Sequence, residues 1–427
     1  MRLTVVLVAA ALLATACTDS PPPPPPEGVL RIGFPNTPIL DEPSFNFALW
    51  TPLIDYDPTT SKVTPRAAES VTSTDLKTWT IKLKPDKYID GAPVTAQSYV
   101  DAWAMLHPLP GGVATAVDRQ TIQVVFAQPM SEVPAMLASE RSLPVRWDKP
   151  EAGNGPFMLD PRQPGDPWRL VRMAKAPGKV NVVEVRLFDD PAKAYDEVAA
   201  GTLDMSLVVP GSRHDAMHKD FADRHAIWPR PRSAVLSFGA DAPEAAARFA
   251  VSMSLDRKAL AAGPMDNQVD AATALIPPAL APGERSGACR ACNLDAAAAK
   301  SLKAQSGLTS VALKAGPVAD QVRSVLGVDT KSGVKIEQKD LRVDSLSPYE
   351  FFTQLGVPSV QQFLDAAAAS ADPAERAQQY RLAENQILRD LPVIPLWTAH
   401  GHAIWSPRVR DVAATAAHGI DLAAISL

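Results

Sequence analysis

The segment VVEVRLFDDPAKAYDEVAAGTLDMSLV, residues 182–208, decides the fold class. It opens with a largely apolar run that is typical of a strand. Asp190 and Pro191 then supply an N-cap and a first-turn proline, and Gly201 stands where a helix ends in a left-handed residue. A second apolar run begins at Leu203. The order strand, helix, strand is the building block of a parallel sheet, so we predict an α/β protein.

Other segments fit the same α/β pattern. Residues 78–83 alternate between apolar and polar side chains, which predicts a strand with one buried face. Thr95 can cap a helix over residues 96–106, in which Tyr99, Trp103 and Leu106 share a face. Further strands are expected at 30–34, 121–126, 168–171, 234–238, 393–397 and 403–405, and further helices at 245–254, 256–262, 294–305 and from Asp372.

The beginning of the chain has the features of an export signal. An apolar run from Leu3 to Ala14 is too short to span a bilayer but fits the core of a signal peptide. It leads into small residues before Cys17, which resemble the cleavage site of lipoprotein precursors. We expect a signal peptide at 1–16 and lipidation of Cys17, which would place the protein outside the cell membrane, anchored to its outer face. The alternative is an ordinary secretory signal with an incidental cysteine.

Six consecutive prolines occupy residues 21–26. Proline lacks a backbone donor and favours an extended, semi-rigid polyproline II conformation. We therefore interpret residues 17–27 as a tether between a lipid anchor and a folded body.

Composition excludes several function classes. With 427 residues, 46% hydrophobic and 21% charged, the chain is long enough for two or three domains with real cores. The net charge of −5 argues against nucleic-acid binding, which requires a basic face. The sequence holds no phosphate-binding loop, dinucleotide fingerprint or Gly-x-Ser-x-Gly motif. We therefore predict neither an enzyme nor a bound cofactor.

Several stretches, in order along the chain, match one family pattern. They are LWTPLIDYDPTTSKVTPRAAES (49–70) with TWTIKLKPDKYIDGAPVTAQSYVDAW (78–103), GNGPFML (153–159), AGTLDMSLV (200–208), FAVSMSLDRKAL (249–260) and ADPAERAQQYRLAENQILRDLPVIPLW (371–397). In these stretches the chain resembles the extracytoplasmic solute-binding proteins of peptide and nickel ABC importers, known as solute-binding protein family 5.

The resemblance implies an α/β, two-lobed fold of the periplasmic-binding-protein type (class II, cluster C), with an extra subdomain in the first lobe. The lobes of such proteins close on a ligand about a hinge. Mapped onto this chain, lobe I would comprise 28–44, 153–232 and 391–427, the extra subdomain 45–152, and lobe II 234–390. The crossings near Ser237-Phe238 and Pro392-Val393 would be hinge strands.

The resemblance also implies a function. The leading hypothesis is a lipid-anchored receptor that captures a peptide or other small solute and delivers it to an ABC permease and ATPase complex. The alternative is a family-derived lipoprotein that has lost transport and regulates or scaffolds the cell envelope.

One departure from the family pattern bears on the ligand. Peptide-binding relatives carry, in the second lobe, a segment whose aspartate pairs with the ligand's α-ammonium group. Here PYEFFTQLG (348–356) runs directly into Val357, and that segment is missing. Asp340, Asp344 or Glu350 could substitute, but their polar surroundings favour solvent-facing positions. We therefore expect weak peptide binding without a strict requirement for a free amino group.

Aromatic residues in cleft-facing segments of the family are candidates for ligand contact. They are Phe34, Trp50, Phe238 and Trp397, and His400 lies close to the last of them. Aromatic side chains supply apolar area in binding clefts. Packing in the hydrophobic core explains the aromatic residues equally well.

Two pairs of histidines are candidate metal ligands. His214 and His218 are four residues apart, but the sequence offers no third ligand at a recognised spacing, so a solvated helix face is the better interpretation. His400 and His402 alternate along a strand-like segment and are interpreted as surface residues, with metal or haem binding as the alternative. We therefore predict no metal site.

The remaining cysteines are Cys289 and Cys292. A redox pair would belong to a thioredoxin-like unit, whereas here a loop rich in proline and glycine precedes the cysteines and an alanine-rich helix follows. In an oxidising compartment they are better explained as a local structural disulfide.

Overall fold

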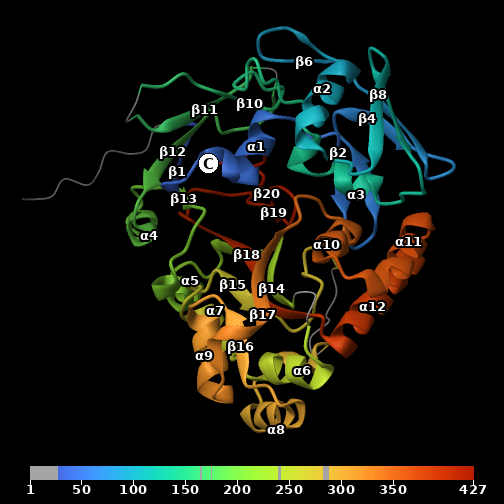
Figure 1. Cartoon of the computed structure of the whole chain (residues 1–427). Coiled ribbons are helices and arrows are strands. Elements are labelled where there is room, and N and C mark those ends of the chain that lie inside the picture. Colours follow the sequence, from blue (N-terminus) through green and yellow to red (C-terminus); the bar gives the residue numbers. More distant parts are fainter. Residues whose placement is uncertain (1–26, 164–165, 175, 239–241, 282–287) are drawn as a thin grey trace, which may run out of the picture.

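The computed structural model describes residues 27–163, 166–174, 176–238, 242–281 and 288–427 (Figure 1). The predicted signal peptide, Cys17 and the six prolines lie outside the described residues. Within the described ranges, no helix is both long and apolar enough to cross a membrane.

A single mixed sheet runs through the molecule. Its strand order is β10-β11-β12-β1-β13-β18-β14-β17-β16, and β15 pairs with β18 beside this path. The strands are β1 (Val29–Pro35), β10 (Phe157–Leu159), β11 (Trp168–Arg172), β12 (Val182–Phe188), β13 (Met205–Ser206), β14 (His225–Phe238), β15 (Val269–Ala271), β16 (Ser310–Leu313), β17 (Asp329–Arg342) and β18 (Val393–Trp405).

The predicted parallel unit is confirmed. Strand β1 lies between β12 and β13 and is parallel to both. The helix α4 (Pro191–Ala199) connects β12 to β13, and the Asp190 side chain accepts a hydrogen bond from the Ala192 amide at its start. The second strand is shorter than predicted, since it pairs over Met205–Ser206 alone.

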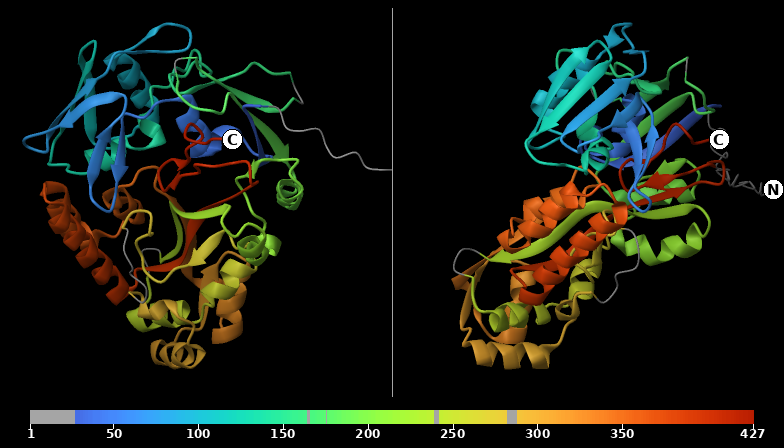
Figure 2. Two further views of the ribbon diagram at one scale, coloured as in Figure 1. Left: turned by 180° about the vertical axis from the view of Figure 1, so that it is seen from behind. Right: turned by 90° about the vertical axis from the view of Figure 1, so that its right-hand side faces the viewer.

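Strands β14 and β18 connect two lobes (Figures 1 and 2). The two strands expected from the sequence at 393–397 and 403–405 are parts of one continuous strand, β18. It pairs with β14 in three stretches, with register shifts between Ala234 and Val235 and between Pro229 and Ser233. Pro229 and Pro231 lack the amide donors that a regular ladder requires, which accounts for the interruption there.

Lobe I contains the first core. It is built from β1, β12, the helix α1 (Pro43–Leu49) and the last residues of the chain, with the short strands β19 (Ala414–Thr415) and β20 (Gly419–Ile420). Phe45 and Trp50, which the sequence places in the extra subdomain, pack in this core. A smaller cluster lies beneath α4 and α5 (His214–Asp220), which follows a 3-10 turn at Gly211–Arg213.

The GNGPF motif holds lobe I to the extra subdomain. A Cβ on Gly155 would lie 2.6 Å from the Ala48 carbonyl oxygen, so a side chain does not fit there. Asn154 accepts a hydrogen bond from the Thr51 amide at 3.2 Å and donates to Asp86 at 2.9 Å. The motif therefore fixes the chain where it leaves the subdomain.

The extra subdomain has a four-stranded antiparallel sheet in the order β4-β5-β9-β8 and its own core, from Leu53 to Ala138 with Ala368 of lobe II added. Thr95 caps α2 through a reciprocal capping box with Ser98, and Tyr99 and Trp103 are buried as predicted. Its elements are β2 (Ile54–Asp57), β3 (Lys62–Pro65), β4 (Ala68–Thr72), β5 (Thr78–Leu83), β6 (Asp86–Lys87), β7 (Pro93–Val94), α2 (Ala96–Leu106), β8 (Gly112–Asp118), β9 (Thr121–Phe126), α3 (Val133–Leu137) and a 3-10 turn (Glu140–Ser142).

Lobe II packs helices on both faces of its part of the sheet, giving two cores. The first half of β18 belongs to these cores, because Val393 and Trp397 pack in them. Asp372 caps α12 without the reciprocal bond of a capping box, because Glu375 accepts a hydrogen bond from the Ser370 hydroxyl. The helices are α6 (Ala245–Met253), α7 (Arg257–Ala262), α8 (Ala296–Ser306), α9 (Pro317–Leu326), α10 (Pro348–Leu355), α11 (Gln361–Ala369) and α12 (Pro373–Asp390).

Candidate functional site

The extra subdomain meets lobe II along a line of polar contacts that we call the seam. It consists of residues 131–141 of the subdomain side and residues 342–376 of lobe II. Three ion pairs cross it: Glu132 with Arg376 at 3.3 Å, Glu140 with Arg342 at 2.7 Å, and Arg141 with Asp344. Backbone hydrogen bonds reinforce it, since the Ser131 amide donates to the Ala368 carbonyl at 2.9 Å. The seam therefore holds the two parts together through specific paired groups.

The Glu132–Arg376 pair is the most buried of the three. The Glu132 side chain is 3% exposed and that of Arg376 is 11% exposed. Burial raises the pKa of the Glu132 carboxyl, and the positive charge of Arg376 and a hydrogen bond from the Ser347 hydroxyl oppose that rise. Arg376 also donates to the Ser61 hydroxyl at 3.2 Å. One guanidinium thus contacts both α3 and the β2–β3 hairpin from lobe II.

A cavity of about 380 Å³ opens beside this pair. Its volume lies within the range of small-molecule sites in proteins, about 300–1,000 Å³. Its walls come from the β2–β3 hairpin, the start of α3, and lobe II segments including α12. The lining residues are Tyr56, Pro58, Thr59, Ser61, Glu132, Ile276, Leu280, Ala281, Leu346, Pro348, Pro373, Arg376, Ala377, Tyr380 and Arg381. The cavity combines apolar and aromatic walls with one carboxylate, Glu132, and two guanidinium groups, Arg376 and Arg381.

A second cavity lies beside β14, one of the two strands that connect the lobes, and it is much smaller than the cavity at the seam. Trp228, Arg230 and Arg232 of β14 line a cavity of about 30 Å³ together with acidic residues from both lobes. Arg230 pairs there with Glu42 at 2.6 Å. A volume of this size holds water molecules but no organic ligand.

The aromatic residues selected from the sequence do not converge on a common cavity among those described here. Phe34 and Trp50 are buried in the lobe I core, and the Phe34 ring meets the Phe45 ring edge-on at 5.3 Å. Phe238 packs against the α6–α9 core of lobe II, and Trp397 lies within it. Trp397 also lines a separate cavity of about 350 Å³ inside lobe II. Ligand contact by these residues stays a prediction, and core packing accounts for their positions.

The histidines differ from the sequence interpretation. His400 and His402 are buried rather than on the surface, because β18 is an internal strand of the sheet. His400 bonds to Asp270 at 2.9 Å and to the Asn267 carbonyl at 3.0 Å. His214 is half-buried next to both of them rather than on a solvated helix face. Tertiary structure thus brings His214 together with two further histidines that its spacing along the sequence does not indicate.

The acidic residues near the missing segment also have defined partners. Asp344 is not solvent-facing, since its side chain is 7% exposed and pairs with both Arg141 and Arg342. Glu350 is half-buried and accepts a hydrogen bond from the Ser345 hydroxyl at 2.6 Å. Asp340 is exposed, as expected.

Cys289 and Cys292 form a disulfide in the structure, and both residues are buried. The neighbouring Arg257 is buried as well, and its guanidinium donates to the carbonyls of Cys292 and Pro395 at 2.7 Å. Burial lowers the pKa of Arg257 to about 9. The disulfide loop is therefore tied to β18 through one arginine.

Sequence reasoning missed Glu132 and Arg376. Arg376 stands inside the family-like stretch that begins at Ala371, but nothing in its spacing indicates a partner far away in the sequence. Glu132 lies just before a short helix and resembles a capping residue, although it makes no side-chain cap. Only the contact between subdomain and lobe II brings the two together.

Comparisons with known proteins agree with this architecture. The family model of bacterial extracellular solute-binding proteins, family 5 (middle), matches residues 62–316, more than half of the chain. No curated protein sequence gives a significant match.

Solved structures with the same two-lobed fold cover nearly the whole chain. The murein tripeptide binding protein MppA of Escherichia coli is 18% identical, with a TM-score of 0.70 over 93% of this chain and 98% of that chain. HbpA2 from Haemophilus parasuis is 16% identical, with a TM-score of 0.73 over 93% and 99%. OppA of Haemophilus influenzae, in complex with RPPGFSPFR, is 16% identical, with a TM-score of 0.68 over 94% and 99%.

These likenesses confirm the predicted two-lobed fold, and the family match confirms the resemblance seen in the sequence motifs. The chain belongs to family 5 of the bacterial extracellular solute-binding proteins.

Proposed function

We propose that this protein is a lipid-anchored receptor of an ABC importer, without enzymatic activity, that captures a small zwitterionic solute such as a short peptide. The solute would bind in the cavity at the seam and be passed to a membrane permease and its ATPase. Family membership supports the class of protein. Among relatives of the same fold, one is named for a murein tripeptide and another was crystallised with a peptide.

One observation carries the choice of site: the 380 Å³ cavity lies between the two parts of the molecule and contains both a carboxylate and a guanidinium. A short peptide carries an ammonium and a carboxylate group at its ends. Charged groups are costly to bury unless they are paired. The paired Glu132 and Arg376, together with Arg381, give the cavity wall groups of both signs of charge.

The expected weak dependence on a free amino group is part of the proposal. Glu132 is already engaged by Arg376 and by the Ser347 hydroxyl, so it is not a free carboxylate waiting for an ammonium. A charge-assisted hydrogen bond is worth about 1.5–3 kcal/mol, equivalent to roughly ten- to a hundred-fold in affinity. Peptides with free and acetylated N-termini should therefore differ by less than this.

Calorimetry with matched free and acetylated tripeptides would test both parts of the proposal. Ala377 lines the cavity, so Ala377→Trp should fill it and abolish binding. Gln378→Trp adds the same bulk at the next residue of α12, which is exposed and outside the lining, and should leave binding unchanged. Unchanged binding by Ala377→Trp would move the site elsewhere. Tight binding with large loss on acetylation would show that an amine anchor exists.

A second function is favoured by a separate observation. The seam is joined by the protein's own ion pairs, and the space beside the crossing strands is too small for an organic ligand. A lipoprotein that regulates or scaffolds the cell envelope would need such a fixed shape and no solute. Deleting the gene and measuring peptide uptake separates the two functions: reduced uptake supports the receptor, and normal uptake with an envelope defect supports the scaffold.

A further inference from the structure

Five of the seven histidines of the chain lie together at one place in the fold. They come from α5, β14 and β18, and are His214, His218, His225, His400 and His402. Neighbouring rings in this group are 4.4–5.8 Å apart between centroids. These histidines belong to elements that take no part in the seam. The helix α5 lies on the opposite side of the molecule from α12 (Figure 1).

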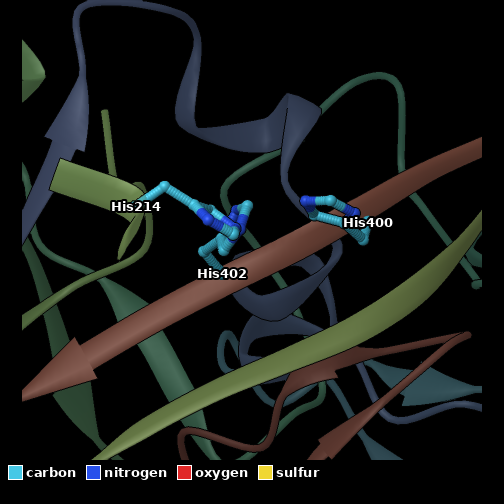
Figure 3. A group of neighbouring side chains, drawn as sticks. All are labelled: His214, His400 and His402. Atoms are coloured by element: carbon cyan, nitrogen blue, oxygen red, sulfur yellow. The ribbon is translucent and has the colours of Figure 1, made fainter. Parts of the chain in front are cut away.

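Three of these histidines have the arrangement of a metal site (Figure 3). One ring nitrogen each from His214, His400 and His402 lies within 4.8 Å of the other two. Tetrahedral zinc with Zn–N bonds of about 2.0–2.1 Å places its nitrogen ligands about 3.4 Å apart. Small side-chain rotations therefore bring the three nitrogens to ligand distance.

His402 gives independent evidence for a ligand. Its residue is 1% exposed, and neither ring nitrogen has a hydrogen-bond partner within the described part of the chain. A neutral imidazole carries one donor and one acceptor, and leaving a buried group unsatisfied costs about 1–3 kcal/mol. A metal ion would use the free lone pair.

His400 has the support that metal-bound histidines usually have. Its Nδ1 lies 2.9 Å from a carboxylate oxygen of Asp270, and its Nε2 lies 3.0 Å from the Asn267 carbonyl oxygen. With the proton held on Nδ1 by Asp270, Nε2 is the ligand atom, as in carboxylate–histidine–metal arrangements. Metal binding would then replace the contact between Nε2 and the Asn267 carbonyl.

The other two histidines satisfy each other and are not needed as ligands. His225 Nδ1 donates to the Phe221 carbonyl at 2.6 Å, so its Nε2 is an acceptor. It faces His218 Nδ1 at 3.2 Å, which is therefore the donor.

We propose that His214, His400 and His402 bind one divalent late transition metal ion such as Zn²⁺, with Asp270 orienting His400. Imidazole ligands suit such ions, whereas Ca²⁺ and Mg²⁺ require oxygen ligands. Three protein ligands leave a fourth tetrahedral position open to water.

The position suggests what the ion does. His214 belongs to lobe I, His400 and His402 to the strand that connects the lobes, and Asp270 to lobe II. The two lobes already touch here, because the Gln268 side chain donates to the Val209 carbonyl at 2.8 Å. A bound ion therefore fastens α5 to the connecting strand at the lobe junction, independently of any ligand at the seam.

The test uses the full chain, purified without metal affinity and freed of metal by a chelator. Calorimetry with ZnCl₂ should find one ion per chain, and Co²⁺ should give the visible absorption of a tetrahedral site. His214→Ala, at a half-exposed position, should weaken Zn²⁺ binding on the order of a hundred-fold, and Asp270→Asn about ten- to a hundred-fold. His402→Gln should also lose the ion, with circular dichroism to confirm folding.

The control is His107→Asn, at an exposed helix end where asparagine tolerates the left-handed backbone. It should bind Zn²⁺ as the wild type does. Absence of binding by the wild type, unchanged affinity in His214→Ala, or equal loss in His107→Asn would each overturn the assignment.

Discussion

Removing the arginine of the buried seam pair tests whether that pair keeps the molecule closed. In Arg376→Met, the methionine fills much of the volume of the arginine stem but leaves Glu132 charged, 3% exposed and without its cation. Breaking a buried pair by removing one partner costs about 3–5 kcal/mol. The chain can relieve that cost by opening the seam, which exposes Glu132 to water. Since 1.4 kcal/mol is a factor of ten, opening should become at least about a hundred-fold more frequent.

The Ser131 amide reports this opening directly, because it donates across the seam to the Ala368 carbonyl. Its hydrogen exchange, followed by mass spectrometry or NMR, should speed up by about a hundred-fold in Arg376→Met. The double variant Glu132→Gln/Arg376→Met removes both charges. Its Ser131 exchange rate should return to within about ten-fold of the wild-type rate, because replacing a whole buried pair is often neutral. Arg381→Met, on the same helix and also lining the cavity, is the control and should exchange as wild type.

The pH dependence of the variant has a definite sign. The pKa of Glu132 is already raised by burial, and loss of Arg376 raises it further. As pH falls through that raised value, the carboxyl becomes neutral and less costly to bury, so the seam of Arg376→Met should close again in acid. Two results would refute the reasoning. One is a Ser131 exchange rate in Arg376→Met equal to that of the wild type, and the other is a Ser131 exchange rate in the double variant as fast as in Arg376→Met.

Four further predictions follow from the same chain. Metabolic labelling with a fatty-acid analogue should mark the wild type but not Cys17→Ser, and equal labelling of both would exclude the anchor. Mass spectrometry of protein from the cell surface should find Cys289 and Cys292 oxidised to each other, and their reduction should lower stability by about 1–3 kcal/mol because the loop is short. Burial lowers the pKa of His418 below its ordinary value of 6.5, so the unfolded state binds the proton more tightly and stability should fall as pH drops below that value. His418→Gln should flatten this part of the pH profile, and an unchanged slope would contradict it. Gly155→Ala should cost about 1–3 kcal/mol in thermal unfolding, since its Cβ would meet the Ala48 carbonyl at 2.6 Å.

Local patterns in the sequence were enough for the elements and the class of fold. The helix α4 begins at Asp190 and Pro191, and α2 begins at Thr95, because capping depends on a side chain and an amide two or three residues apart. The period of apolar residues identified the buried strand 78–83 in the same way. Such features are set by neighbours in the chain, so the sequence contains them.

The sites were decided by tertiary structure. Glu132 meets Arg376, and His214 meets His400 and His402, only because the connecting strands bring distant segments to one place. The sequence interpreted the paired histidines as surface residues, since spacing along the chain carries no information about what covers a strand. The same limit applies to Trp50 and Trp397, because a tryptophan in the sequence fits a binding cleft and a hydrophobic core equally well.

Sequence by itself determined the export signal pattern, the α/β order and the family motifs, because these rest on local periodicity and capping. The seam, its cavity and the histidine site depend on packing between segments that are distant in the sequence, which no local pattern encodes.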